Sequence, residues 1–113
     1  MKENRDKLYL LHVRDAIEKV ELYSSGKKFD DFSKDEQSFD AIMMQFIVIG
    51  ESVNNLSDEF KDSHHDLSWH EAVGLRNQTA HGYFDIDKSI VWQTIKEDLP
   101  VLKKEIMGIL NKL

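Results

Sequence analysis

Apolar residues recur at intervals of three and four along most of this chain, and this spacing is the strongest constraint on its fold. Between about Asp6 and Tyr23 the apolar positions are Leu10, Val13, Ile17 and Val20, and charged residues fill many of the positions between them. One face of an α-helix has this period. One proline and five glycines in 113 residues are too few for an all-β protein with a turn every ~10 residues. The sequence therefore predicts an all-α fold.

A second helix is expected from Ser33 or Asp35 to about Asn54, after a polar loop at 27–34. Ser33 and Glu36 have the spacing of a capping box, in which each side chain satisfies the other residue's backbone amide. The middle of this helix is very apolar, so it is expected to be buried on more than one side. It is either the central helix of a bundle or covered on one face by a partner subunit.

Two more helices follow at the same spacing. The third is expected to start at a Ser68 cap and to stop at Gly82, and the last to start at Asp85 or Asp87. Pro100 lies within the last helix and removes one backbone hydrogen bond, so a kink or a break is expected there. Short connections between the helices predict an up-down four-helix bundle.

Composition narrows the class of protein further. The chain, residues 1–113, fits a single domain, and the absence of cysteine excludes disulfides, thiolate zinc sites and cysteine nucleophiles. A net charge of −6, from 15 basic and 21 acidic residues, argues against a broad basic face for duplex nucleic acid. No targeting signal and no membrane-spanning segment is visible, so we expect a cytoplasmic protein.

The segment from Arg76 to Tyr83 is the most informative for chemistry. Within eight residues it brings together a guanidinium, an amide, a hydroxyl, an imidazole and a phenol, near the end of the third helix. Asn77 and His81 are four apart and share one helix face, and the long Arg76 side chain could reach over to it. Arginine pairs with phosphate oxygens, and histidine transfers protons near neutral pH. With the RNA 2′-hydroxyl as nucleophile, cleavage would need no metal or cofactor.

Each of these residues also has a simpler interpretation. Arg76 and His81 could form only a charged, capped helix end. Glu51, in an otherwise apolar helix, marks either a return to solvent or a partner that orders Arg76 or His81. Tyr83 could be a packed aromatic residue rather than an accessible phenol. Three histidines and two acids at 64–71 lack metal-ligand spacing, so we expect no metal site there.

The sequence resembles the HEPN ribonucleases, and in particular their HepT branch. The resemblance covers nearly the whole chain from Leu8 to Leu110 and has no departure at the motif positions. The segments that carry it are Arg76-Asn77-x3-His81-x-Tyr83, Ile49-Gly50-Glu51-Ser52, Asp85-Ile86-Asp87, Val91-Trp92 and Asp98-Leu99-Pro100.

The resemblance implies a role for each motif position. Arg76 and His81 would be the catalytic pair, and Asn77 would assist at the phosphate or hold His81. The active protein would be a homodimer whose two motifs face each other across a cleft. It would be the toxin of an MntA–HepT (type VII) toxin–antitoxin system. MntA, a minimal nucleotidyltransferase, would transfer AMP from ATP to Tyr83 and so block RNA.

Two other functions stay open at this stage. The chain could be a non-catalytic helical subunit that binds a nucleotide or a nucleotidyltransferase partner, an alternative that its acidic charge favours. It could also be a scaffold only. If it does act on RNA (tRNA or mRNA), the missing basic patch confines that action to a small cleft around Arg76 and His81.

Overall fold

The computed structural model describes residues 2–113, with side chains from residue 4 onward, and within this range it contains helices and no strand. The elements in chain order are α1 (Lys2–Ser24), α2 (Phe29–Lys34), α3 (Glu36–Asn54), α4 (Asp58–Ser63), α5 (His70–Gly82), a 3-10 turn (Tyr83–Asp85), α6 (Lys88–Gln93), a π-helical segment (Thr94–Asp98) and α7 (Leu99–Lys112).

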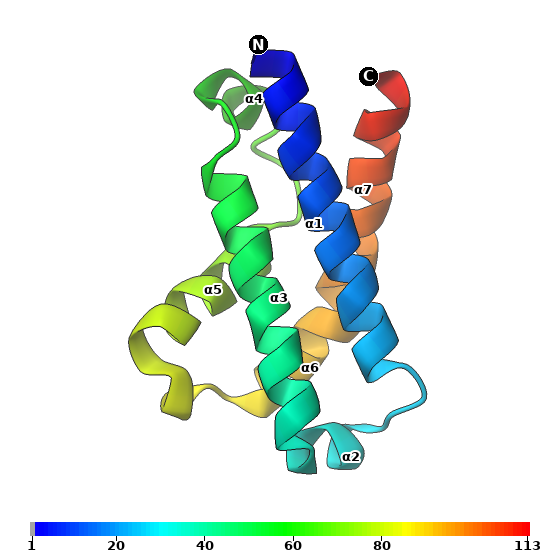
Figure 1. Cartoon of the computed structure of the whole chain (residues 1–113), viewed down its shortest axis with the longest axis vertical. Coiled ribbons are helices and arrows are strands. Elements are labelled where there is room, and N and C mark those ends of the chain that lie inside the picture. The colour runs from blue at the N-terminus through cyan, green and yellow to red at the C-terminus, as the bar shows by residue number, and fades with distance from the viewer. Residues whose placement is uncertain (1) are drawn as a thin grey trace.

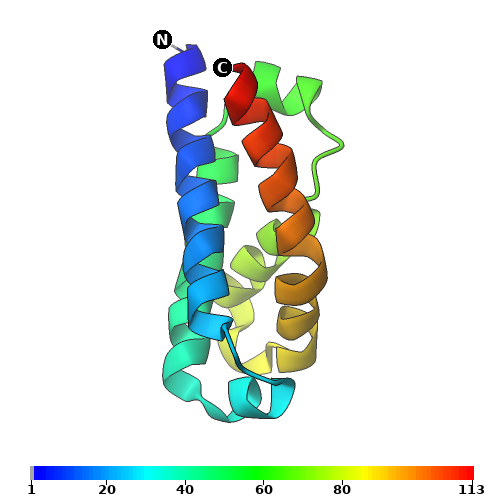
Figure 2. The ribbon, with the colours of Figure 1, turned by 90° about the vertical axis from the view of Figure 1, so that its right-hand side faces the viewer.

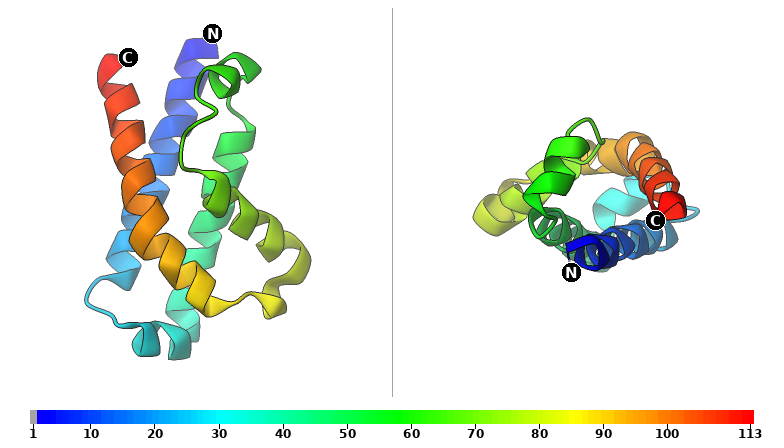
Figure 3. Two further views of the ribbon diagram at one scale, coloured as in Figure 1. Left: turned by 180° about the vertical axis from the view of Figure 1, so that it is seen from behind. Right: turned by 90° about the horizontal axis from the view of Figure 1, so that it is seen from above.

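The long helices alternate in direction along the main axis of the molecule. α1 and α3 lie side by side, and the rod made by α6, the π-helical segment and α7 returns to the end where the chain starts (Figures 1 and 2). α5 packs mainly against α3, with a smaller contact to the π-helical segment, and projects outward from the other long helices (Figure 3). The all-helical arrangement is consistent with a HEPN-like fold.

A single apolar core joins these elements. Its largest fully buried side chains come from every long helix except α5 and include Leu10, Ile17, Phe46, Leu99 and Ile106. α5 contributes only Ala72 and Leu75 as buried residues. The helix that carries the motif is therefore attached by a narrow apolar strip, and its outer face stays open to solvent.

Two predicted helix starts, at Asp35 and Asp87, are confirmed by their capping geometry. Asp35 precedes α3 and its Oδ1 accepts a hydrogen bond from the Ser38 amide at 3.0 Å. Asp87 caps α6 by accepting from the Ser89 amide at 2.9 Å. After α1, Gly26 has a φ of 74°, the left-handed conformation that glycine adopts without strain.

The prediction of a polar loop at 27–34 is wrong in part, because residues 29–34 form α2. Phe32 on this short helix is fully buried, with its ring centroid 5.8 Å from that of Phe39 and 5.0 Å from that of Trp92. The predicted capping box of Ser33 is also wrong, since Ser33 lies inside α2 and donates to the Asp30 carbonyl. Burial of the Phe32 ring therefore accounts for the helix in this segment, although its composition is polar.

The predicted Ser68 cap is wrong as well. α5 begins two residues later, and the Ser68 amide instead donates to the Glu105 carboxylate of α7 at 3.1 Å. Ser68, which the local pattern assigned to the helix start, is therefore hydrogen-bonded through its backbone amide to a residue 37 positions away.

The helix irregularity that was predicted at Pro100 lies in the residues just before this proline. Thr94–Asp98 adopt π-helical geometry, and Pro100 occupies the first turn of α7. Proline is tolerated there because the first amides of a helix have no intrahelical partner. The ribbon bends along this stretch instead of running straight (Figure 3).

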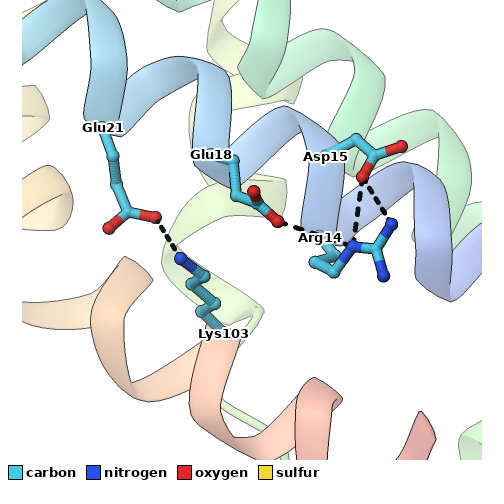
Figure 4. Close-up of polar contacts among 5 residues, drawn as sticks. All are labelled: Arg14, Asp15, Glu18, Glu21 and Lys103. Carbon is cyan, nitrogen blue, oxygen red and sulfur yellow. Dashed lines mark hydrogen bonds and ion pairs between the residues drawn. The ribbon is translucent and has the colours of Figure 1, made fainter.

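One ion pair in the described range joins α1 to α7. Lys103 of α7 contacts Glu21 of α1 at 2.9 Å, while Arg14 pairs with Asp15 and Glu18 within α1 (Figure 4). The Glu21 carboxylate raises the pKa of Lys103 through this hydrogen bond. Both side chains are partly exposed, so such a pair contributes at most about 1 kcal/mol.

The expectation that α3 is buried on several sides holds for most of its length. Met44 is an exception at 55% exposure, and Ile47 and Val48 beside it are half-buried. No helix in the described range is long and apolar enough to cross a membrane.

Candidate active site

Arg76 lies where α5 crosses α3, and a glycine makes the crossing possible. A Cβ atom placed on Gly50 would come within 3.0 Å of three carbon atoms of the Arg76 side chain. The Arg76 stem therefore lies directly over the α3 backbone. The sequence pairs these features as Gly50-Glu51 on α3 and Arg76-Asn77 on α5.

The Arg76 guanidinium is held by Glu51 and Asn77. Its Nη2 and Nε donate to Glu51 Oε1 at 2.5 and 3.2 Å, and its Nη1 donates to Asn77 Oδ1 at 3.0 Å. The Arg76 side chain is 25% exposed and that of Glu51 is 51% exposed. The ordering role considered for Glu51 thus has a direct geometric counterpart. Sequence spacing alone did not choose between Arg76 and His81 as its partner.

Arg76 can still bind a phosphate group in this arrangement. A guanidinium carries five N–H donors, and three of them are used by Glu51 and Asn77. One donor is left on each terminal nitrogen. These remaining donors can bind phosphate oxygens.

His81 lies in the last turn of α5 and is exposed. In the described part of the chain no hydrogen bond or ion pair engages its imidazole. Asn77 is one turn earlier on the same face, but its carbonyl contacts Arg76 rather than the imidazole. The imidazole is therefore available to an outside group.

No hydrogen bond joins Arg76 and His81 in the part of the chain that the structure describes. They are five positions apart, which corresponds to a rotation of about 140° around a helix with 3.6 residues per turn. The guanidinium donates to Glu51 on α3 and to Asn77, which lies on the His81 face, but not to the imidazole itself.

Tyr83 is the first residue of the 3-10 turn that follows α5, and its hydroxyl donates to Asp40 Oδ1 on α3. Its ring makes edge contacts with Phe39 and Phe84, at centroid distances of 5.8 and 5.9 Å. Partial burial, followed by the hydrogen bond to Asp40, raises the pKa of Tyr83 well above the ordinary value for tyrosine. Tyr83 is thus both packed, as one sequence interpretation held, and hydrogen-bonded at the surface.

A hollow of about 330 Å³ lies beside this tyrosine. Its lining combines aromatic rings with both signs of charge: Glu36, Phe39, Asp40, Tyr83, Phe84, Ile86 and Lys88. Phe84 at its rim is 99% exposed. The Lys88 ammonium is 5.0 Å from the centre of the Phe39 ring and donates to the Ser33 carbonyl at 2.9 Å.

Asp40 is the residue of this region that the sequence did not reveal. It precedes Tyr83 by 43 positions, and no motif links the two. The only local signal is an acid directly after a buried aromatic residue, Phe39, near the start of an apolar helix. That signal does not identify a partner.

These features define a class: small all-helical proteins that present an Arg-x4-His element on a helix end beside an ordered glutamate. Residues 13–109 match the HepT-like family, described as ribonuclease HepT-like. The chain belongs to this family.

Individual relatives agree with this assignment. The "Probable ribonuclease HepT" of Thermococcus cleftensis is 35% identical over 95 residues, which cover 84% of this chain and 86% of the relative. A "Putative RNase" of Caldanaerobacter subterraneus subsp. tengcongensis is 36% identical over 104 residues, or 92% and 93% of the two chains. No solved structure matches the chain.

One relative is much longer. A Methanocaldococcus jannaschii protein named "Gamma-glutamylcyclotransferase and putative RNase" is 35% identical over 107 residues. The match covers 95% of this chain but only 48% of that relative. The chain thus spans about half the length of that protein.

Proposed function

We propose that this chain is a metal-independent endoribonuclease, the toxin of a toxin–antitoxin pair, with Arg76 and His81 as its catalytic residues. The observation that carries the proposal is the state of these two side chains. The Arg76 guanidinium is oriented by Glu51 and keeps two free donors, and the exposed His81 imidazole has no partner in the described chain. Membership of the HepT-like family supports RNA as the substrate.

The chemistry follows from these groups. The 2′-hydroxyl of RNA would attack the adjacent phosphorus, with the 5′-oxygen of the next nucleotide as the leaving group. His81 would move a proton at one of these oxygens, and Arg76 would stabilise the charge that develops on the phosphate. Glu51 and Asn77 would be positioning residues, because they contact Arg76.

The proposed active form is a homodimer. Arg76 and His81 leave α5 about 140° apart around the helix axis, and a second copy facing the first would bring the Arg76 of one chain to the His81 of the other. The exposed Met44 on α3, with half-buried apolar neighbours, offers apolar surface for such contact.

The proposed regulation is the transfer of AMP from ATP to Tyr83 by an MntA-like nucleotidyltransferase antitoxin. Tyr83 lies two residues beyond His81, so an added phosphate would bring negative charge close to the catalytic imidazole and repel RNA. Intact-mass spectrometry of the protein co-expressed with its neighbouring gene tests this part. The expected result is an addition of one or more AMP groups that maps to Tyr83.

Cleavage is tested with purified protein and total RNA in the presence of EDTA. The wild type is expected to degrade RNA, while Arg76→Ala and His81→Ala lose at least about 100-fold in rate. Equal degradation by wild type and His81→Ala would contradict the catalytic assignment.

A second candidate function rests on charge. The chain carries a net charge of −6, and Glu51 already neutralises Arg76, which would also suit a non-catalytic subunit that binds a nucleotide or a nucleotidyltransferase. Expression without the neighbouring gene separates the two, because a binding subunit should not arrest growth and a ribonuclease toxin should.

A further inference from the structure

The contact between Tyr83 and Asp40 is an unusual arrangement for a surface tyrosine. The phenol hydroxyl donates to a carboxylate that comes from a different helix, and Phe39 next to Asp40 fixes the ring by an edge contact at 5.8 Å. The hydroxyl therefore has one defined position, at the wall of the 330 Å³ hollow.

This position presents a chemical problem for modification of the tyrosine. Burial and the Asp40 carboxylate raise the pKa of Tyr83, so its oxygen carries a proton at neutral pH. A neutral phenol is a weak nucleophile, and nucleophilic hydroxyl groups in proteins are activated by an adjacent base. The group in contact with the hydroxyl is the Asp40 carboxylate.

We propose that Asp40 is the proton acceptor for nucleotide transfer to Tyr83. The inference rests on the proposed function, because it deepens the modification step proposed there. The Tyr83 oxygen forms a bond to the α-phosphorus of ATP, and the bond from this phosphorus to the β-bridging oxygen breaks. The electron pair leaves with pyrophosphate, and the phenol proton passes to Asp40 Oδ1.

The high pKa of the resting tyrosine is compatible with this step. As the oxygen–phosphorus bond forms, the phenol oxygen gains positive character and its proton becomes far more acidic. A carboxylate already in hydrogen-bond contact can then accept the proton during bond formation, which is the geometry that general-base catalysis requires. No free tyrosinate is needed beforehand.

The surroundings of the hydroxyl suit an incoming nucleotide. The hollow has a volume in the range of small-molecule sites. Lys88 on its lining supplies a positive charge for phosphate oxygens, and the exposed Phe84 ring offers a face for a base. Glu36, the other acid of the hollow, makes no hydrogen bond with Tyr83 among the described residues and provides a matched comparison.

The experiment measures the rate of Tyr83 modification in the full-length chain with its nucleotidyltransferase partner and ATP. Asp40→Asn keeps an oxygen that can accept the Tyr83 hydrogen bond but removes the base. It is expected to slow modification about 100-fold or more. Glu36→Gln, with the same charge change in the same hollow, is expected to stay within about twofold of wild type.

A second measurement excludes a merely structural effect. Replacing Tyr83 by 3,5-difluorotyrosine lowers the intrinsic pKa of the phenol, and it is expected to restore most of the rate in the Asp40→Asn background. RNA cleavage by unmodified Asp40→Asn is expected to match wild type, since Asp40 contacts neither Arg76 nor His81.

Three outcomes would overturn the inference. Modification of Asp40→Asn at the wild-type rate or faster would show that Asp40 does not accept the proton, while leaving the proposed regulation intact. Failure of difluorotyrosine to rescue the slow variant would show that Asp40 only positions the ring. If the wild type itself takes up no AMP, the proposed regulation fails and this inference fails with it.

Discussion

The Arg76 guanidinium of α5 donates two hydrogen bonds to a single carboxylate oxygen of Glu51 on α3, at 2.5 and 3.2 Å. The two residues are 25 positions apart, and their contact joins α5 to α3 where the two helices cross. Because the guanidinium is planar, these two bonds together with the Nη1 bond to Asn77 Oδ1 fix both its place and its plane.

Replacing Glu51 by Gln should therefore weaken catalysis far more than stability. Loss of the charge partner lets the guanidinium reorient, and such misplacement costs about 10- to 100-fold in rate. The pair is partly exposed, so the free energy of unfolding should fall by less than about 1 kcal/mol. RNA cleavage and urea denaturation of the same preparation measure the two effects.

The control for this variant is Glu21→Gln, which breaks the Lys103 ion pair between α1 and α7. That pair is 2.9 Å long, and its side chains are 33% and 47% exposed, against 25% and 51% for Arg76 and Glu51. Stability should change by a similar small amount, with cleavage unaffected. If Glu51→Gln and Glu21→Gln cleave RNA equally well, Glu51 does not order the site.

Gly50→Ala should both destabilise the fold and impair cleavage. The new Cβ would come within 3.0 Å of the Arg76 side chain, so either that side chain or α5 must shift. Overpacking of this kind costs about 1–3 kcal/mol. Thermal and urea denaturation measure the loss.

Gly74→Ala on α5 provides the contrast. A Cβ there meets no atom within 4 Å, and alanine is the better helix former by about 1 kcal/mol. This variant should be as stable as wild type or more stable, with normal cleavage. Equal stability of Gly50→Ala and Gly74→Ala would refute the close packing of Arg76 on α3.

The sequence predicted the parts of this molecule that depend on local spacing. The helical class, the Asp35 and Asp87 caps and the helix end that carries Arg76 and His81 all follow from residues within a few positions of one another. For Glu51 the sequence left two interpretations, because an acid in an apolar helix does not name its partner. The packing of α5 on α3 is what brings it to Arg76.

Contacts between distant segments account for what the sequence did not predict. α2 forms because Phe32 is buried against rings of α3 and α6, although the segment is polar. The Asp40–Tyr83 pair spans 43 positions and depends on where the turn after α5 meets α3. Neither the position of that turn nor the hollow beside it can be derived from periodicity.

The raised pKa of Tyr83 predicts a loss of stability at high pH. An unfolded tyrosine ionises near pH 10, whereas the folded Tyr83 keeps its proton to a higher pH because of burial and Asp40. Its stabilising contribution is therefore complete below about pH 10 and is lost as the pH rises above that value. The free energy of unfolding should fall more steeply above pH 10 in wild type than in Tyr83→Phe.

Comparing these two proteins cancels the contribution of Lys103, whose pKa is also raised and which both contain. Urea denaturation between pH 8 and 11 gives the two curves. Parallel curves throughout this range would contradict the raised pKa of Tyr83.

The proposed homodimer predicts that each active site combines residues from two copies of the chain. In a mixed dimer of Arg76→Ala with His81→Ala, one of the two composite sites has both groups intact. Such a dimer, isolated through two different affinity tags, should retain about half of the wild-type activity although each parent is inactive. In a dimer of wild type with the Arg76→Ala/His81→Ala double variant, every composite site lacks one group, so activity should be lost. The reverse pattern, an inactive first dimer and a half-active second, would show that each chain carries a complete site of its own.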